Sequence, residues 1–407
     1  MRRRPQRPIL VVTPSFRGGS WRRTEEALRR VADVDNGHGV PDARDHPAPT
    51  FLCVGYGPAS TAERRRQILP APHRVVQIPF GDYSQWHFLV QAPFLAVLVS
   101  LPLALITYVQ AVLRRPHTIF ANGLVAAFLV LPVAGLLRAR LLVAHHGWVA
   151  DVRGPAAGLT QLLGRRLDKI FVNSRGSARD LARLIPRDRL VVLEHNAAPI
   201  FFESHKPLDA WQGHDLGDRR VVLFVSRLDE EKNVDLLLQV IDDSVDDRSP
   251  TLFVIVGGGE LRSEVEKRAQ VAPDRVLYLG YVEDQELLAR LYASADVFWG
   301  CGTATYLELP AVEALVTGTP ILIPNRSSIL GARRQGHDRV SPDLVPNNSG
   351  CLVEPKAAAL GEALQGMLSG IEQGRYERRQ IRDQARRRYG LGNMTPLLDA
   401  LREGSDG

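Results

Sequence analysis

The chain has 407 residues, of which 45% are hydrophobic and 24% charged, with a formal net charge of +6 at pH 7. This length and composition predict an ordinary globular protein of two or three domains. Its three cysteines, Cys53, Cys301 and Cys351, form no CxxC pair. They argue against a disulfide framework and a zinc site, and for a reducing compartment.

The charge is divided unevenly along the chain. Residues 1–200 carry 27 Lys and Arg against 13 Asp and Glu, whereas residues 201–407 carry 24 against 32. Such asymmetry predicts a partner that only the first half contacts. No signature of RNA or DNA binding is present, and the arginines are scattered rather than interleaved with aromatic residues. We therefore expect no nucleic-acid partner and favour an anionic membrane surface.

The first strand is predicted at Ile9–Val12, after a basic start that lacks the apolar core of a signal peptide. The loop that follows contains Gly18 and Gly19. A glycine pair in this position lets backbone approach a ligand closely, or it forms a plain turn. Further strands are expected at Phe51–Gly55 and Arg74–Phe80.

Residues 88–113 form an uncharged apolar run that ends at Arg114 and Arg115. The run is long enough to span a bilayer. It could instead be a buried helix pair broken near Pro93 or Pro102, or a helix in the membrane interface. A span would separate strands that belong to one sheet, so we reject it. We favour a helix that is partly buried and partly membrane-facing.

Strands and helices then alternate, which predicts a parallel, doubly wound α/β sheet. A strand at Thr118–Gly123 precedes an apolar helix at Leu124–Leu137, and the strand Arg140–Ala144 ends in His145 and His146. Ligands of such sheets bind beyond the carboxyl ends of the strands, where these histidines lie. A histidine there binds a ligand or satisfies a loop carbonyl.

The most informative stretch begins at the strand Val221–Val225. Asp229 is placed to cap a helix that continues through 236–238, with Arg227 on the preceding turn and Lys232 in the first helical turn. Two cations beside a helix N-terminus make a site for a polyanion. The alternative is that Lys232 pairs with nearby acids on a solvated face.

A second helix start that suits an anion lies at Leu309, where Pro310 occupies an early position and Gly318 is placed to end the helix. Glu313 falls one turn inside this helix. Its carboxylate could accept hydrogen bonds from a pair of ribose hydroxyls, or it could be an ordinary helix glutamate. Three glycines at 257–259 follow the strand Thr251–Val256 and permit close backbone approach.

Taken together, the second half resembles the nucleotide-binding half of a family-4 glycosyltransferase, a retaining family with the GT-B fold of two facing Rossmann-like domains. Five landmarks occur in order: SRLDEEKNVDLLL, FVIVGGGELRSEVEKRA, VLYLGYVEDQELLARLYASADVFW, LELPAVEALVTGTPILIP and SGCLVEP. Each landmark alone is weak evidence for the resemblance, but five landmarks in this order and at suitable spacing are specific evidence for it.

The resemblance implies roles for individual residues. Arg227 and Lys232 would hold the donor diphosphate, Glu313 the ribose, and the backbone at Tyr281 and Val282 the base. His146 matches a histidine that contacts the donor sugar in the family. The loop with Gly18 and Gly19 would face donor and acceptor, and the backbone at Leu309 belongs to the same donor-binding set.

The sequence also departs from the family pattern. The family has two glutamates separated by seven residues; Glu313 matches the second, and Thr305 stands in place of the first. Glu308 occupies a position where glycine is usual, beside the expected diphosphate. It either replaces the missing glutamate or caps the helix, and we favour the cap.

We therefore predict a retaining glycosyltransferase of the hexosyltransferase type that needs no cofactor and no metal. The expected domains are 1–200 for the acceptor, 201–375 for the nucleotide sugar, and closing helices at 376–407 that pack back on the first domain. The acceptor would be a glycan or lipid-linked, and the protein peripheral on the cytoplasmic face of the cell membrane. The alternatives are a sugar-nucleotide epimerase of the same fold and a non-catalytic, membrane-associated binding protein.

Overall fold

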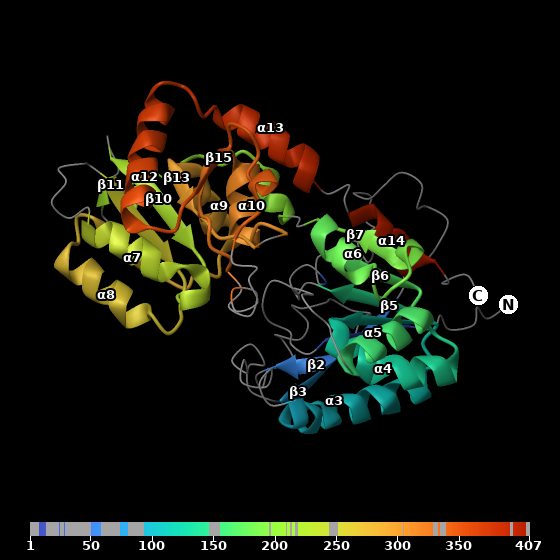
Figure 1. Cartoon of the computed structure of the whole chain (residues 1–407). Helices are drawn as coiled ribbons and strands as arrows, with labels where there is room; N and C mark the ends of the chain where they lie inside the picture. The colour runs from blue at the N-terminus through green and yellow to red at the C-terminus, as the bar shows by residue number, and fades with distance from the viewer. Residues whose placement is uncertain are drawn as a thin grey trace. The chain divides into compact units, whose positions relative to one another are not determined.

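The backbone of the computed structural model is drawn in Figure 1. The structure describes residues 8–13, 24, 28, 50–57, 74–79, 93–145, 155–194, 197–208, 210–211, 214–215, 219–243, 251–303, 305–328, 333, 339–390 and 394–403. The chain divides into two units, each built on its own parallel sheet. Unit 1 comprises Met1–Leu193 and Met394–Gly407, and unit 2 comprises Glu194–Asn393.

Unit 1 contains a seven-stranded sheet in the order β3-β2-β1-β4-β5-β6-β7, and neighbouring strands are parallel throughout. In chain order the strands are β1 Ile9–Thr13, β2 Phe51–Gly57, β3 Arg74–Pro79, β4 Thr118–Asn122, β5 Arg140–His145, β6 Lys169–Val172 and β7 Leu190–Val192. Most are continuous runs of buried apolar residues, as expected of strands covered on both faces.

Alternate residues of these strands face two different helical layers. One face packs under α3 (Pro93–Arg114), α4 (Leu124–Leu137), α5 (Pro155–Arg166) and α6 (Arg175–Leu181), with Leu10 and Val12 pointing that way. The other face, reached by Ile9 and Val11, packs against Leu28 and the final helix α14 (Thr395–Arg402). This alternation follows from the two-residue period of a strand.

The described part of the apolar run predicted at 88–113 is one helix, α3, which begins at Pro93 and continues through Pro102. Leu103, Thr107 and Ala111 are buried, whereas Leu105 on the opposite side is 68% exposed. The helix is therefore half buried, as expected. Among the residues that the structure describes, no helix is long and apolar enough to cross a membrane.

Unit 2 contains a six-stranded parallel sheet in the order β12-β11-β10-β13-β14-β15. Its strands are β10 Arg220–Val225, β11 Thr251–Val256, β12 Val276–Gly280, β13 Val297–Trp299, β14 Ile321–Pro324 and β15 Gly350–Val353. Its helices are α7 Val234–Asp243, α8 Arg262–Val271, α9 Gln285–Ser294, α10 Leu309–Thr317, α12 Ala357–Glu372 and α13 Arg378–Tyr389. A two-stranded hairpin of β8 (Ala210–Trp211) and β9 (His214–Asp215) precedes the sheet.

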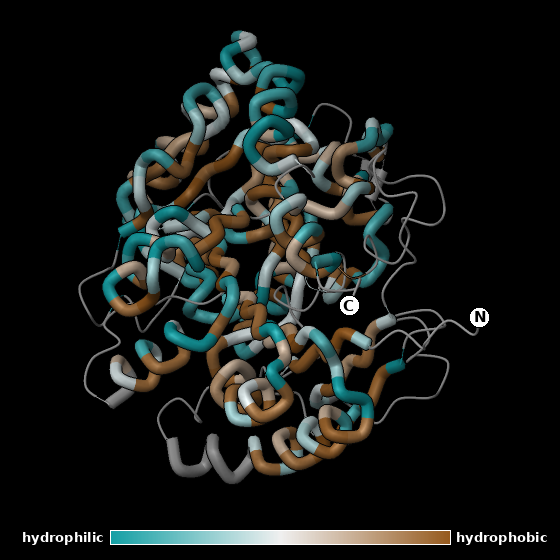
Figure 2. The backbone as a smooth tube through the Cα atoms, turned by 90° about the vertical axis from the view of Figure 1, so that its right-hand side faces the viewer, coloured by the Kyte–Doolittle hydropathy of each residue, from teal (hydrophilic) through white to brown (hydrophobic). Residues whose placement is uncertain are grey.

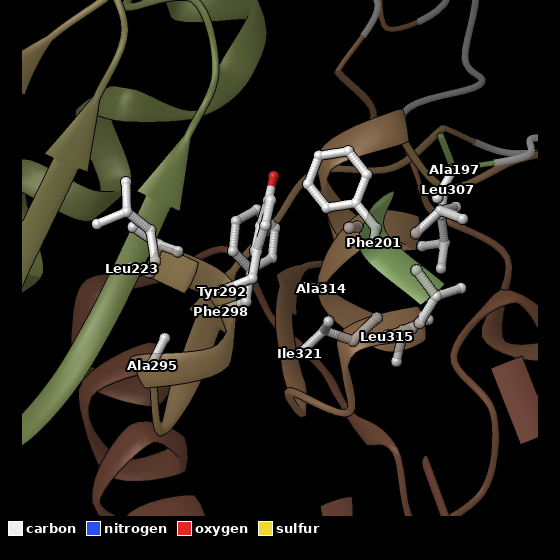
Figure 3. Close-up of a cluster of buried hydrophobic side chains, with 14 of the residues drawn as sticks. Ala197, Phe201, Leu223, Tyr292, Ala295, Phe298, Leu307, Ala314, Leu315 and Ile321 are labelled. Atoms are coloured by element: carbon white, nitrogen blue, oxygen red, sulfur yellow. The ribbon is translucent and has the colours of Figure 1, made fainter. Parts of the chain in front are cut away.

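The core of unit 2 centres on aromatic side chains from well-separated elements (Figure 3). Tyr292 packs against Phe201, with ring centroids 5.8 Å apart, and against Phe298 at 5.4 Å. Helix α10 lies over the same cluster, and every residue from Ala311 to Thr317 is buried. This packing fixes α10 against β13 and β14, where the functional residues described below are found.

The closing helices are divided between the two units. We expected both to pack back on the first domain, but α13 packs on α10 within unit 2, and only α14 belongs to unit 1. Arg378 explains the attachment of α13, because its guanidinium donates to the carbonyls of Tyr292, Ala293 and Ala295 and to the Thr319 hydroxyl. Burial lowers the pKa of this arginine to about 10.

Candidate functional site

The candidate site lies at the topological switch point of the unit 2 sheet. From β10 the chain moves outward through β11 and β12, and it then returns to place β13, β14 and β15 on the other side. The loops after β10 and β13 therefore leave the sheet in opposite directions, which opens space beyond the carboxyl ends of these strands. Lys232 and Glu308 come from these two loops.

The turn after β10 is held by the glycine-rich loop after β11. Leu228 donates its N–H to Gly258 at 3.0 Å, and Ser226 donates to Val256 at 3.1 Å. Gly257 has a φ of +142°, and a Cβ at this position would lie 1.8 Å from the Ser226 carbonyl oxygen. The glycines do allow a close backbone approach, as expected, but the backbone that they approach is the turn Ser226–Leu228 of the same chain.

The helix predicted to start at Asp229 is interrupted. Asp229 does cap, because its side chain accepts from the Lys232 N–H, but the capped segment is a short 3-10 turn, Glu230–Lys232. Asn233 then adopts the left-handed conformation, with φ 57°, and α7 begins at Val234. Lys232 consequently ends the 3-10 turn, and it does not lie in the first turn of an α-helix.

Lys232 forms an ion pair with Glu308 across the switch point. Its Nζ lies 2.9 Å from Glu308 Oε1, and the two side chains are only 12% and 23% exposed. Ser328, which follows β14, donates its hydroxyl to the same carboxylate oxygen at 2.7 Å. Lys232 therefore pairs with an acid, as the alternative interpretation held, but in a largely buried position and with an acid distant in the sequence.

Each partner keeps the other charged. Burial alone would lower the pKa of Lys232, but the Glu308 carboxylate outweighs it and leaves that pKa raised. Burial alone would raise the pKa of Glu308, but Lys232 and the Ser328 hydroxyl leave that pKa lowered. The buried thiol of Cys301 contacts the Lys232 carbonyl at 3.0 Å, and burial raises its pKa to about 12.

The other cations of the site are held by acids near the start of α7. Arg227 lies 2.6 Å from Asp229 and 2.8 Å from Glu231, and its side chain is 47% exposed. Arg326, after β14, donates to the Asn233 side chain at 2.6 Å and also pairs with Asp235. Arg227 thus lies on the solvent side of the site and Lys232 on the protein side.

Glu308 occupies the N-cap position of α10, but its side chain makes no capping hydrogen bond. The favoured cap is therefore confirmed in position only, because the carboxylate points to Lys232 and Ser328 and accepts no hydrogen bond from the N–H groups of α10. Pro310 lies in the first turn of α10, and Gly318, with φ 90°, ends the helix as predicted. The N-terminus of α10 therefore begins next to the Lys232–Glu308 pair.

Glu313 is buried one turn into α10, and its Oε2 accepts a hydrogen bond from the Tyr292 hydroxyl at 2.9 Å. Thr305 is half-buried, and its hydroxyl has no hydrogen-bond partner among the described residues. Leu309 begins α10 beside Glu308. Tyr281 is 67% exposed in the loop after β12, whereas Val282 packs against the core.

Three predicted site residues, Gly18, Gly19 and His146, lie outside the described residues. Their neighbour His145 is described at the end of β5, and burial lowers its pKa to about 4. At the switch point of unit 1, between β1 and β4, the Asn122 amide donates to Thr13 Oγ1 at 3.1 Å.

Three contributors to the unit 2 site were not predicted: Cys301, Arg326 and Ser328. All follow a strand of the sheet directly or closely, so their position at its carboxyl edge was the signal that could have revealed them. Among the described ranges, no group of three or more His, Cys, Asp or Glu residues is placed to hold a metal ion.

Comparison with known proteins finds similarity in the second half of the chain and along the whole fold. Residues 219–370 match the family described as glycosyl transferases group 1. A GDP-mannose-dependent alpha-(1-6)-phosphatidylinositol dimannoside mannosyltransferase of Mycobacterium tuberculosis is 28% identical over 155 residues, 38% of this chain and 35% of the relative. The alpha-monoglucosyldiacylglycerol synthase of Streptococcus pneumoniae is 28% identical over 122 residues, 30% of this chain and 27% of the relative. The chain thus spans about a third of the length of these relatives.

The fold has solved counterparts along its whole length. Anabaena HepE, solved in complex with UDP, superposes with a TM-score of 0.66 at 17% identity, covering 97% of this chain and 99% of that one. Sucrose-phosphate synthase from Thermosynechococcus elongatus gives 0.64 at 16% identity, with 97% and 98% covered. The chain therefore has the GT-B fold of two Rossmann-like domains, and residues 219–370 of its second unit match the group 1 glycosyl transferases.

Proposed function

We propose that the protein is a retaining glycosyltransferase that moves a hexose from a nucleotide-diphosphate sugar to a membrane-proximal or lipid-linked acceptor. The observation that carries this proposal is the Lys232 ammonium, held charged and largely buried at the switch point of unit 2. Cations and helix N-termini in such a place stabilise the negative charge that develops on a departing diphosphate. A group 1 glycosyl transferase domain over the same residues supports this assignment.

In the proposed reaction, the bond between the anomeric carbon and the diphosphate oxygen breaks, and the oxygen of an acceptor hydroxyl forms the new glycosidic bond on the same face of the sugar. The proton of that hydroxyl passes to the departing diphosphate. Lys232 and Arg227 stabilise the leaving group, with the backbone at Leu309 adding the partial positive charge of a helix start. Glu313 accepts hydrogen bonds from the ribose, and the backbone near Tyr281 and Val282 meets the base. His146 contacts the donor sugar, and Gly18 and Gly19 give the backbone room beside it.

The acceptor class rests on two lines of support. The names of the relatives just described contain phosphatidylinositol dimannoside and monoglucosyldiacylglycerol, which are lipids. Unit 1 also exposes aliphatic side chains along α3. We propose accordingly that the protein is peripheral on the cytoplasmic face of the membrane.

Calorimetric titration of the purified chain with UDP, GDP and ADP tests the donor site. We expect one nucleotide to bind to the wild type and the Arg227→Ala/Lys232→Met variant to lose that binding. Lys267→Met is the control, because Lys267 also pairs with a glutamate but does so on the exposed surface of α8. Failure of all three nucleotides to bind would favour a non-catalytic protein of the same fold.

A further inference from the structure

Helices α3, α4 and α5 of unit 1 lie side by side, and all three end in arginine at the same edge of the sheet. In a parallel sheet each crossover helix returns the chain to the edge where the next strand starts, so consecutive helices end together. Helix α3 ends at Arg114 and Arg115, α4 at Arg138, and α5 at Arg165 and Arg166. Five arginines therefore lie along the amino-terminal edge of the unit 1 sheet, and two of them, Arg138 and Arg166, line one cavity.

The outer faces of these helices are aliphatic. Leu105 and Leu113 of α3 are 68% and 70% exposed, and Leu136 of α4 is 76% exposed. On α5, Leu159 and Leu162 are exposed on the side that leads to Arg166. Figure 2 shows α3 as a largely brown helix at the bottom of the view. An exposed apolar face of this extent, bordered by cations, is unusual on a protein surface that meets only water.

Two of the arginines occupy strained backbone positions. Arg115 and Arg138 have φ values of 47° and 53°, in the left-handed region where a helix usually ends in glycine. Arg138 closes α4 through N–H bonds to Ala134 and Gly135. A side chain at a position that glycine would fill without strain suggests that the side chain has a function of its own.

Arg138 and Arg166 border a cavity of about 270 Å³ at the end of α4. Arg140, also in its wall, is already bound to the Ala400 carbonyl and to Glu403, and Asp168 accepts from the Leu141 N–H. The Arg138 and Arg166 side chains, in contrast, make no hydrogen bond or ion pair with any residue that the structure describes. The cavity thus presents two uncommitted guanidinium groups.

We propose that this cavity binds the phosphate of an anionic phospholipid, and that the aliphatic faces of α3, α4 and α5 rest on the bilayer around it. Guanidinium groups match phosphate oxygens in geometry as well as in charge. The neighbouring exposed leucines favour a phosphate attached to acyl chains over one free in water. This deepens the membrane-proximal part of the proposed function, but the binding itself requires neither donor nor sugar transfer.

Co-sedimentation of the full chain with vesicles tests the proposal, in the absence of any nucleotide. We expect binding to vesicles of equal parts phosphatidylglycerol and phosphatidylcholine, little binding to phosphatidylcholine alone, and weaker binding in high salt. Arg138→Gly/Arg166→Gln should lower the partition coefficient roughly ten- to thirtyfold, since each arginine near an anionic surface contributes about a factor of five.

The matched control is Arg375→Gln/Arg379→Gln, which removes the same charge from exposed arginines of unit 2. Arg138→Gly relieves backbone strain, and Arg166→Gln breaks no hydrogen bond or ion pair with a described residue. The melting temperature of the double variant should therefore not fall, and this measurement excludes misfolding as the cause of lost binding. If the control and the test variant lose vesicle binding equally, the effect depends on net charge alone, and the proposed phosphate site is wrong. Arginine-dependent calorimetric binding of inorganic phosphate without vesicle binding would overturn the lipid assignment. A dimer that Leu105→Gln abolishes, in a protein that does not bind vesicles, would also overturn the lipid assignment. The aliphatic face would then be covered by a second copy of the chain.

Discussion

The Lys232 ammonium and the Glu308 carboxylate, 76 residues apart, meet at 2.9 Å between the loops that leave β10 and β13. The carboxylate thus occupies the partner position that a donor phosphate would take in the proposed reaction. The site is already neutralised before any ligand arrives. A nucleoside diphosphate must therefore compete with Glu308 for Lys232 or share the lysine with it.

Glu308→Gln should tighten binding of the nucleoside diphosphate. Removing the carboxylate frees the ammonium and removes a repulsive charge, so we expect roughly a tenfold gain, or about 1.4 kcal/mol. Calorimetry with the preferred nucleotide measures the change, and Glu266→Gln serves as the control because Glu266 pairs with Arg262 on an exposed helix. An affinity that falls would instead show that Glu308 positions Lys232 for the phosphate.

Lys232→Met should lower turnover by about two to four orders of magnitude, in line with the loss of a central charge-stabilising donor. The variant also leaves Glu308 buried without its cation, which should cost roughly 3 kcal/mol of unfolding free energy. The double variant Lys232→Met/Glu308→Gln removes both charges and separates the two effects. Its stability should largely return while its turnover stays low; recovery of turnover would exclude a role for Lys232 in catalysis.

The stability of the fold should depend on pH through the same pair. The pKa of Glu308 is lowered in the folded state, so its contribution is present above its ordinary value of 4.5 and is lost as the pH falls through the folded value. The pKa of Lys232 is raised, so its contribution is present below 10.5 and is lost as the pH rises through the folded value.

Urea unfolding of the wild type and of Lys232→Met/Glu308→Gln at a series of pH values measures this dependence. The difference in unfolding free energy between the two proteins should be constant between about pH 5 and pH 10 and should shrink at both extremes. A difference that changes steadily across the neutral range would mean that another titrating group dominates.

Gly257→Ala should destabilise unit 2, whereas Gly258→Ala should not. A Cβ at 257 would lie 1.8 Å from the Ser226 carbonyl oxygen, in a left-handed backbone, whereas nothing lies within 4 Å of a Cβ at 258. We expect a loss of about 3 kcal/mol for the first and less than about 1 kcal/mol for the second. Similar melting temperatures for the two variants would contradict the contact with the turn.

Arg138→Gly should raise the free energy of unfolding by about 1 kcal/mol, because glycine adopts the left-handed conformation that ends α4 without strain. Arg114→Gly is the matched comparison, since Arg114 lies inside the last turn of α3 and glycine there costs about 0.5–1 kcal/mol. The midpoint of chemical denaturation should therefore rise for Arg138→Gly and fall for Arg114→Gly, relative to the wild type.

The sequence identified most strands of both sheets, because buried parallel strands are short apolar runs bounded by turn residues. It did not identify β15, since Gly350–Val353 is too short to show a period of its own. Helix α12 was also missed, although Leu360, Leu364 and Leu368 recur at helical spacing and could have revealed it. The division of α13 and α14 between units was also missed. Which unit takes a helix depends on contacts such as those of Arg378, and spacing does not reveal them.

For the site, the family resemblance placed Arg227, Lys232 and Glu308 near one another, but the direction of each side chain could not be predicted. Glu308 looked like a cap because it precedes α10 and carries the right charge. Whether it caps or pairs with Lys232 depends on a lysine 76 positions earlier and a serine 20 positions later. Long-range pairings of this kind become visible only in the folded chain.

The chain passes from unit 1 to unit 2 and returns only for its last helix. During synthesis, all of unit 2 therefore leaves the ribosome before α14 exists. Until Leu397 and Leu401 arrive, the strand face that presents Ile9 and Val11 lacks part of its cover. We expect unit 2 to reach its native state first, although it lies later in the sequence, and the half-covered sheet of unit 1 to be the stage most exposed to aggregation and to chaperones.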